Sequence, residues 1–363
     1  MRAGPGQVLA GRYRLTDRPE ALRAAAVDEG TGESVLLRAL ELPALLTGGH
    51  DPQDGDPPQA DRLVRRVGAV GSTAPAWHPR LLRGVGAFVD GELLWTVEER
   101  PAGVPLAELA AAGPLPPYRA AELAADLAGA LRSLHEAGLS HGNLTAESVL
   151  VCEDGAAMLG GLLSGVAEEA LAEDLGGPGG RRRYEVRATL VGPVAERWPL
   201  DGGPAGDCWA LGVLLQRLLT GRSPYPEGGV PELVTAVRDG RREPSASCGP
   251  LAPLVERLLQ PDPALRPTAD EVRRELAVLL AGAPEPADGE RAAREVVPRP
   301  AGPLVRSARG RGRGAAVPSA GRGAGTGGGK PPRIPPALLG PLLVGGVFLL
   351  LVLGVVAVVM FAG

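Results

Sequence analysis

The spacing of apolar residues along the 363-residue chain changes near residue 100. Before that point the apolar runs are short and are separated by turn residues such as Asp90-Gly91, a pattern typical of strands. After it, apolar residues recur every three or four positions, which predicts helices. Strands are expected over residues 7–16, 22–28, 34–40, 81–90 and 92–98, with a helix near 60–71 and a polar insert near 47–59.

The clearest helix is expected over Tyr118–Ala137. Its apolar residues recur at helical spacing, namely Ala121, Leu123, Leu127, Leu131 and Leu134. A strand-rich first part followed by a helix-rich remainder predicts an α+β fold in which the two kinds of structure are segregated.

The most apolar stretch runs from Ala337 to Phe361, 25 residues without a charged or strongly polar side chain. About 20 such residues cross the hydrocarbon layer of a bilayer as a helix. A core helix of a globular domain would show a polar face, and this stretch has none. The sequence therefore predicts one transmembrane helix over residues 337–361.

Charge is distributed unevenly before this stretch. Eight basic residues and no acidic residue follow residue 298, whereas the first 298 residues carry 30 basic and 42 acidic residues. Because the basic residues precede the span, the positive-inside rule predicts a single-pass protein of the cell membrane with everything before the span in the cytoplasm and essentially no extracellular domain. The Pro/Gly/Arg-rich segment 282–336 is expected to be a disordered linker, whose arginines either fix this topology or contact anionic lipid.

Composition adds three smaller points. Lys330 is the only lysine beside 37 arginines, so an arginine at an expected lysine position can reflect compositional bias. Three widely spaced cysteines form no metal or disulfide pattern, which favours a reducing cytosol, and the first 15 residues lack the apolar core of a signal peptide. The arginine-glycine run of the linker lacks interleaved aromatic residues, so no nucleic-acid partner is expected.

Four segments carry a family resemblance. Residues 139–151 read LSHGNLTAESVLV and are similar to the H-R-D-L-K-P-x-N-V-L-L catalytic loop of eukaryotic-type protein kinases. Residues 93–109, 207–221 and 254–276 resemble, in order, the hinge strand, a long C-lobe helix and the closing segment of the bacterial Ser/Thr enzymes. Because the four segments occur in the order and at the spacings of this family, the chain is identified as a member of the bacterial, actinobacterial-type, eukaryotic-like Ser/Thr protein kinase family.

This resemblance implies a bilobal protein-kinase-like fold over residues 8–280. A small β-rich N-lobe is expected over about residues 8–99 and a larger helical C-lobe over about residues 100–280. Together with the linker and the predicted span, the chain would then have three parts.

The residues that perform chemistry in this family are replaced at the matching positions. In the family an Asp of the catalytic loop takes the proton of the substrate hydroxyl, a later Asn and the Asp of a DFG triplet hold magnesium, and a strand Lys binds the phosphates. These positions hold Asn143, Ser148, Gly161 and Arg38 in this chain.

Each replacement removes a property that phosphoryl transfer needs. The amide of Asn143 is neutral, and Gly161 offers no carboxylate oxygen to a metal ion. Arg38 carries a planar fork instead of a compact ammonium group. The phosphate-loop segment 17–26 contains no glycine, and Arg66 stands near the expected glutamate partner of the strand lysine. A combined deficit on the order of 8 kcal/mol in the activation free energy would bring the rate near background.

Residues that support the kinase fold are retained, and we interpret them as structural contacts. The resemblance implies that Glu196 pairs with Arg266, that Asp207 binds the backbone of the catalytic loop, and that His141 packs in that loop. Arg181-Arg182-Arg183-Tyr184 is either a docking patch or phosphosite for an active kinase or a solvated loop, and Thr189 matches the substrate-loop threonine, interpreted as a relic.

The sequence therefore predicts a membrane-anchored pseudokinase that acts as a signalling scaffold or regulator. Its expected partners are proteins, either an active Ser/Thr kinase or envelope-synthesis proteins, and membrane lipid. No cofactor is expected, neither ATP nor magnesium. An active but atypical Ser/Thr kinase and a nucleotide-sensing domain without transfer stay open as alternatives.

Overall fold

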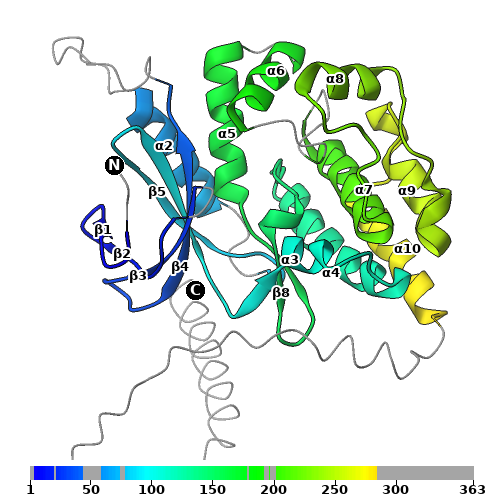
Figure 1. Cartoon of the computed structure of the whole chain (residues 1–363), viewed down its shortest axis with the longest axis horizontal. Coiled ribbons are helices and arrows are strands. Elements are labelled where there is room, and N and C mark those ends of the chain that lie inside the picture. The colour runs from blue at the N-terminus through cyan, green and yellow to red at the C-terminus, as the bar shows by residue number, and fades with distance from the viewer. Residues whose placement is uncertain are drawn as a thin grey trace, which may run out of the picture. The chain divides into compact units, whose positions relative to one another are not determined.

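The structure is a computed structural model that describes residues 4–19, 22–43, 59–73, 78–177, 180–191, 196 and 202–283. All of these residues belong to one compact unit, residues 1–304, in which a β-rich lobe lies beside a helical lobe (Figure 1). The protein-kinase-like bilobal arrangement predicted from the sequence is confirmed.

The N-lobe contains a six-stranded antiparallel sheet with the strand order β1-β2-β3-β4-β6-β5. Its strands are β1 (Val8–Leu9), β2 (Tyr13–Leu15), β3 (Arg23–Asp28), β4 (Ser34–Glu41), β5 (Gly84–Asp90) and β6 (Leu93–Glu99). The strand predicted over residues 7–16 is wrong as a single strand. Ala10 and Gly11 both have positive φ, of 47° and 62°, so the chain turns back on itself there and forms the β1–β2 hairpin.

The two faces of this sheet are covered differently. On one face, side chains of the sheet itself form a small core that includes Tyr13, Leu37 and Trp95. The other face packs against α2 (Gln59–Thr73) and α5 (Leu162–Gly176), which contribute Leu63 and Leu163 to a second core. In Figure 1, α5 stands beside the sheet and leads into α6 (Gly180–Val191) at its far end.

The C-lobe surrounds the largest core of the described residues. Its remaining elements are β7 (Gly103–Pro105), α3 (Leu106–Ala111), α4 (Pro117–Glu136), η1 (Ala146–Ser148), β8 (Val149–Cys152), β9 (Ala157–Leu159), α7 (Pro204–Thr220), α8 (Val230–Arg238), η3 (Ser245–Leu251), α9 (Ala252–Leu258), η4 (Pro263–Leu265) and α10 (Ala269–Ala281). The apolar stripe predicted for residues 118–137 lies in α4, where its leucines are buried, including Leu127 and Leu131. Strands β7, β8 and β9 form a small antiparallel sheet.

Two predictions concern residues that the structure does not describe. The transmembrane span over residues 337–361 and nearly all of the linker over residues 282–336 lie outside the described ranges. Among the described helices, none combines the length and apolar character needed to cross a bilayer. The span therefore stays a prediction from the sequence.

Candidate functional site

The loop between α4 and β8 contains the positions that match the catalytic loop, and Asp207 fixes its backbone. Asp207 lies in the first turn of α7 and is 1% exposed. Its two carboxylate oxygens accept hydrogen bonds from the backbone amides of His141 (2.8 Å) and Gly142 (2.7 Å), and Nε2 of His135 lies 2.8 Å from Oδ2. Gly142 has a φ of +65°, which favours glycine. The contact that the resemblance implied between Asp207 and this loop is present.

His141 is a structural residue of the same loop. Its Nε2 lies 3.1 Å from the carbonyl oxygen of Gly160, and its Nδ1 accepts the backbone N–H of Asn143 at 3.2 Å. Burial lowers the pKa of His141 below its ordinary value. The ring is therefore neutral at pH 7, with the proton on Nε2 donated to Gly160.

Asn143, at the position of the catalytic base, is almost fully buried. It is 2% exposed, and its Nδ2 donates to the carbonyl oxygen of Gly161 at 3.1 Å. Helix α5 passes directly over it at Gly165, where a Cβ would lie 2.6 Å from the carbonyl oxygen of His141 and 2.8 Å from the Cβ of Asn143. The residue presents a neutral amide that is already hydrogen-bonded within the protein.

Ser148, at the position of a magnesium ligand, serves the local backbone. Its hydroxyl donates to the carbonyl oxygen of Thr145 and accepts the Thr145 amide, both at 2.9 Å, as part of a capping box around η1. Ser148 is 2% exposed, so its side chain is buried within the loop. The side chain therefore stabilises the turn before β8.

Gly161, at the position of the DFG aspartate, is the N-cap of α5. Its φ of +81° lies in the left-handed region, and the helix begins at the next residue. Leu163 then enters the core beneath the sheet, where a Cβ on Gly84 would lie 2.7 Å from one of its methyl carbons. The Gly-Leu-Leu sequence starts a packed helix at the position of the metal-binding triplet.

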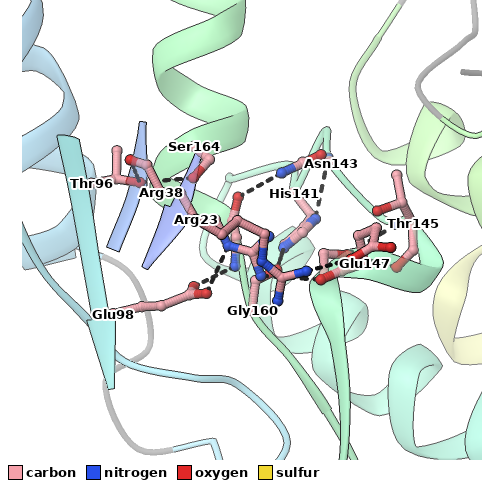
Figure 2. Close-up of polar contacts among 12 residues, drawn as sticks. Arg23, Arg38, Thr96, Glu98, His141, Asn143, Thr145, Glu147, Gly160 and Ser164 are labelled. Carbon is pink, nitrogen blue, oxygen red and sulfur yellow. Dashed lines mark hydrogen bonds and ion pairs between the residues drawn. The ribbon is translucent and has the colours of Figure 1, made fainter. Parts of the chain in front are cut away.

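Arg38 on β4 forms an ion pair that the sequence did not predict. Its Nε lies 3.0 Å from Oε1 of Glu98 on β6, and its NH2 group donates to the carbonyl oxygen of Glu147 at 3.1 Å. The second carboxylate oxygen of Glu98 accepts the amide of Gly161 at 2.5 Å. Figure 2 shows the guanidinium and the carboxylate directed toward one another between the lobes.

A second arginine lies next to this pair. Arg23 on β3 is opposite Arg38 in the strand register and forms an ion pair with the carboxylate of Glu147. Burial, and then the neighbouring charge of Arg38, lowers the pKa of Arg23. These contacts join the N-lobe sheet to the loop of the C-lobe.

A cavity of about 750 Å³ lies between the lobes. Residues of β3, β4, β6, β7, α3, the loop and α5 line it, including Arg38, Thr96 and Asn143. Its volume is within the usual range for a small-molecule site.

The helix partner expected for the strand lysine is also replaced. Arg66 on α2 forms an ion pair with Glu173 of α5 at 2.6 Å, on the surface. Within the described part of the chain, the carboxylate paired with Arg38 comes from β6 and not from α2.

Arg187 on α6 is a buried residue that the sequence reading missed. It is 7% exposed, lies 2.9 Å from the buried carboxylate of Glu168 and donates to the carbonyl oxygen of Gly142 at 2.6 Å. It therefore fastens α6 to the loop that contains Asn143. Thr189, on the same helix, donates its hydroxyl to the carbonyl oxygen of Glu185.

The ion pair expected between Glu196 and Arg266 is wrong in its partner. Glu196 accepts a hydrogen bond from Nε of Arg217 at 2.7 Å. Arg266 instead donates to backbone carbonyl oxygens, with Nε 2.7 Å from that of Gln260, and its guanidinium lies over the ring of Trp209 at 4.9 Å. The physical reason is that the guanidinium of Arg266 is hydrogen-bonded to the carbonyl oxygens of Gln260, Ala205 and Pro261, so Arg217 in the last turn of α7 pairs with Glu196 instead.

Metal ligands are sparse in the described ranges. They contain no group of three or more His, Cys, Asp or Glu side chains that could hold a metal ion. Asp154, one of the acids nearest the DFG position in the sequence, accepts the backbone N–H of Ala156 at 2.9 Å and so serves the β8–β9 turn.

One signal in the sequence could have identified Glu98. It is an acidic residue inside the strand Leu93–Glu99, whose central residues are otherwise apolar or small and buried. A buried carboxylate requires a partner. Arg38 on the paired strand β4 is that partner. No comparable signal pointed to Arg187, because its burial depends on how α5 and α6 pack.

The comparisons with known proteins agree with this geometry. The family model described as "Protein kinase domain" matches residues 69–276. The match begins in α2, so the strands that hold Arg23 and Arg38 lie before it.

Three curated relatives illustrate the similarity. The chain is 30% identical to "Serine/threonine-protein kinase PkaA" of Streptomyces coelicolor over 74% of this chain and 47% of that protein. It is 29% identical to "CBL-interacting protein kinase 25" of Oryza sativa subsp. japonica over 67% of this chain and 45% of that protein. It is 32% identical to "Testis-specific serine/threonine-protein kinase 3" of Mus musculus over 44% of this chain and 58% of that protein. The chain thus spans about half the length of these relatives. The family match, the two lobes and the loop held by Asp207 together show that this chain belongs to the protein kinase domain family.

Proposed function

We propose that this chain is a pseudokinase, a member of the family that transfers no phosphate and acts as a signalling scaffold or regulator. The observation that carries this proposal is the state of Asn143. At the position of the catalytic base it presents a neutral amide, 2% exposed, bonded to Gly161 and covered by α5. An amide has no useful basicity near pH 7, so Asn143 cannot take the proton of a substrate hydroxyl, although it lines the cavity between the lobes.

The electrostatics of the cleft support the same proposal. Phosphoryl transfer depends on metal ions and on positive charge around the phosphates. Here the guanidinium of Arg38 is already paired with Glu98. The hydroxyl of Ser148 donates to the carbonyl oxygen of Thr145, and Gly161 is the N-cap of α5. We therefore propose that neither ATP nor magnesium is a cofactor of this chain.

The partners we propose are proteins, either an active Ser/Thr kinase or proteins of envelope synthesis. The C-lobe keeps a large buried core, while the positions that perform the chemistry hold Asn143, Ser148 and Gly161. Residues 337–361 would hold this domain at the cytoplasmic face of the membrane, with the basic linker beside the lipid.

A transfer assay tests the proposal directly. The 363-residue chain is incubated with labelled ATP and magnesium or manganese, alone and with a general protein substrate. No incorporation above that of a heat-denatured sample is expected. Incorporation that requires Asn143 would establish the atypical active kinase instead, and a rise of the Tm with ATP in the absence of transfer would favour the nucleotide-sensing domain.

Restoring the family residue is not expected to restore activity. Asn143→Asp places a carboxylate oxygen where Nδ2 now donates to Gly161 at 3.1 Å, so two acceptors would face one another in a buried site. We expect the free energy of unfolding to fall by about 2 kcal/mol, with no phosphate transfer. Urea denaturation and the transfer assay measure the two effects. Gln260→Glu, an amide-to-acid change at a partly exposed position, is the matched control and should stay within about 0.5 kcal/mol of the parent.

Removal of residues 337–363 is expected to change where the chain is found. An apolar stretch of this length favours insertion into a bilayer. The parent chain should sediment with membranes and resist extraction by high salt, whereas the shortened chain should appear in the soluble fraction. A shortened chain that still sediments and is released by salt would assign the attachment to the basic linker.

A further inference from the structure

Glu98 is a buried carboxylate held in the way that a protein holds a bound anion. One oxygen lies 3.0 Å from Nε of Arg38, and the other accepts the amide of Gly161 at 2.5 Å. The residue is 6% exposed. Its two oxygens thus receive one charge-assisted bond from a side chain and one bond from a backbone amide.

The backbone around this carboxylate is shaped to receive it. A Cβ on Gly160 would lie 3.1 Å and 3.2 Å from the two oxygens of Glu98 and 2.7 Å from a methyl carbon of Leu82. Gly161 is the N-cap of the 15-residue helix α5, so its amide belongs to the positive end of the helix dipole. A guanidinium, a helix N-terminus and a close glycine together form a site for an oxyanion.

Arg38, one of the two donors of this site, also lines the cavity between the lobes. Arg38 and Thr96 line that cavity, whereas Glu98 and Gly161 are not among its lining residues. Beyond its Cβ, the Glu98 side chain consists of a methylene and a carboxylate group, so removing it leaves room for a small carboxylate such as formate. Because Arg38 borders both the cavity and the Glu98 carboxylate, the expected route of an anion to the emptied position passes Arg38.

We propose that Arg38 and the amide of Gly161 form an oxyanion-binding site that Glu98 fills from within the chain. Glu98 thereby neutralises Arg38 and occupies the position that an anion from solution would take. When the side chain of Glu98 is removed, a small carboxylate from solution binds in its place.

Binding of formate to Glu98→Ala tests this proposal. The Tm of the purified 363-residue chain is measured in sodium formate and in sodium chloride of the same ionic strength. We expect formate to raise the Tm of Glu98→Ala by about 5 °C relative to chloride when its concentration is on the order of 100 times its Kd. The parent chain, whose site is full, should change by less than about 1 °C.

Two control variants make the result specific. Glu99→Ala removes the neighbouring acid of β6, whose carboxylate instead accepts the backbone N–H of Arg83 at 2.9 Å, and it should respond to formate as the parent does. Arg38→Met/Glu98→Met removes both charges, so it should fold without a formate response.

Each outcome decides the proposal. A formate response in Glu98→Ala that is absent from the double variant supports it, and so does a Glu98→Ala chain that folds only in formate. An equal response in all variants would show a general salt effect and overturn it. Failure of Glu98→Ala to fold at any formate concentration would also overturn it. This measurement involves no phosphate transfer, so its failure would leave the proposed function untouched.

Discussion

Replacement of Asp207 by alanine is expected to lower the free energy of unfolding by about 4 kcal/mol. The buried carboxylate accepts the backbone amides of His141 and Gly142 and contacts Nε2 of His135. Alanine leaves these groups without an acceptor in a site that excludes water, and an unsatisfied buried donor costs about 1–3 kcal/mol. The change also leaves a small cavity beneath the loop.

Urea denaturation followed by tryptophan fluorescence measures this loss. Asp239→Ala is the control, because Asp239 is an exposed acid paired with Arg238, and its removal should leave the free energy of unfolding close to that of the parent. Asp207→Asn should fall between the two, since its amide keeps one oxygen acceptor but turns an NH2 group toward a backbone donor. Equal stability of Asp207→Ala and the parent would mean that the loop does not depend on this carboxylate.

The fold was predictable because it follows from local patterns. The leucine spacing of α4, the Asp90-Gly91 turn between β5 and β6, and the helix near residues 60–71 are each properties of a short stretch of chain. The β1–β2 hairpin was missed because its turn uses Ala10 with a positive φ, a conformation that alanine rarely adopts.

The site was predictable only where the family pattern applies. The resemblance placed Asn143, Ser148, Gly161 and Arg38, and the structure brings all four to the junction of the lobes. The partners of these residues could not be predicted. Glu98 meets Arg38 across paired strands, 60 residues apart.

Two further contacts depended on packing that no local pattern encodes. Arg187 reaches Gly142 only because α5 and α6 fold back over the loop, and Arg217 rather than Arg266 meets Glu196 because of its place on α7. The positions at which family residues are replaced can therefore be found from the sequence, whereas the contacts of the replacing side chains have to be found from the structure.

Helix α5 connects these observations, because it buries Asn143 and supplies the amide that Glu98 accepts. Leu163 anchors the helix beneath the sheet, and the ion pair between Glu168 and Arg187 ties it to α6. An active protein kinase requires this segment to leave the catalytic loop open to substrate. The stability of α5 on the loop is therefore the property that the proposed function depends on most.

Gly165→Ala tests that property, and we expect it to lower the free energy of unfolding by about 3 kcal/mol. In an exposed helix the same change would raise stability by about 1 kcal/mol, because alanine is the better helix former. Here the new methyl group would lie 2.6 Å from the carbonyl oxygen of His141 and 2.8 Å from the Cβ of Asn143. Asp207 holds the loop at this point, so the loop cannot move aside without breaking its own hydrogen bonds.

Gly68→Ala is the matched control, since Gly68 lies on an exposed turn of α2 with no atom within 4 Å of the added Cβ. It should raise the free energy of unfolding by up to about 1 kcal/mol, opposite in sign to Gly165→Ala. Urea denaturation of both variants, together with limited proteolysis within α5, measures the difference. If Gly165→Ala instead stabilised the chain, α5 would not rest on the loop, and the burial of Asn143 that supports the absence of phosphate transfer would no longer hold.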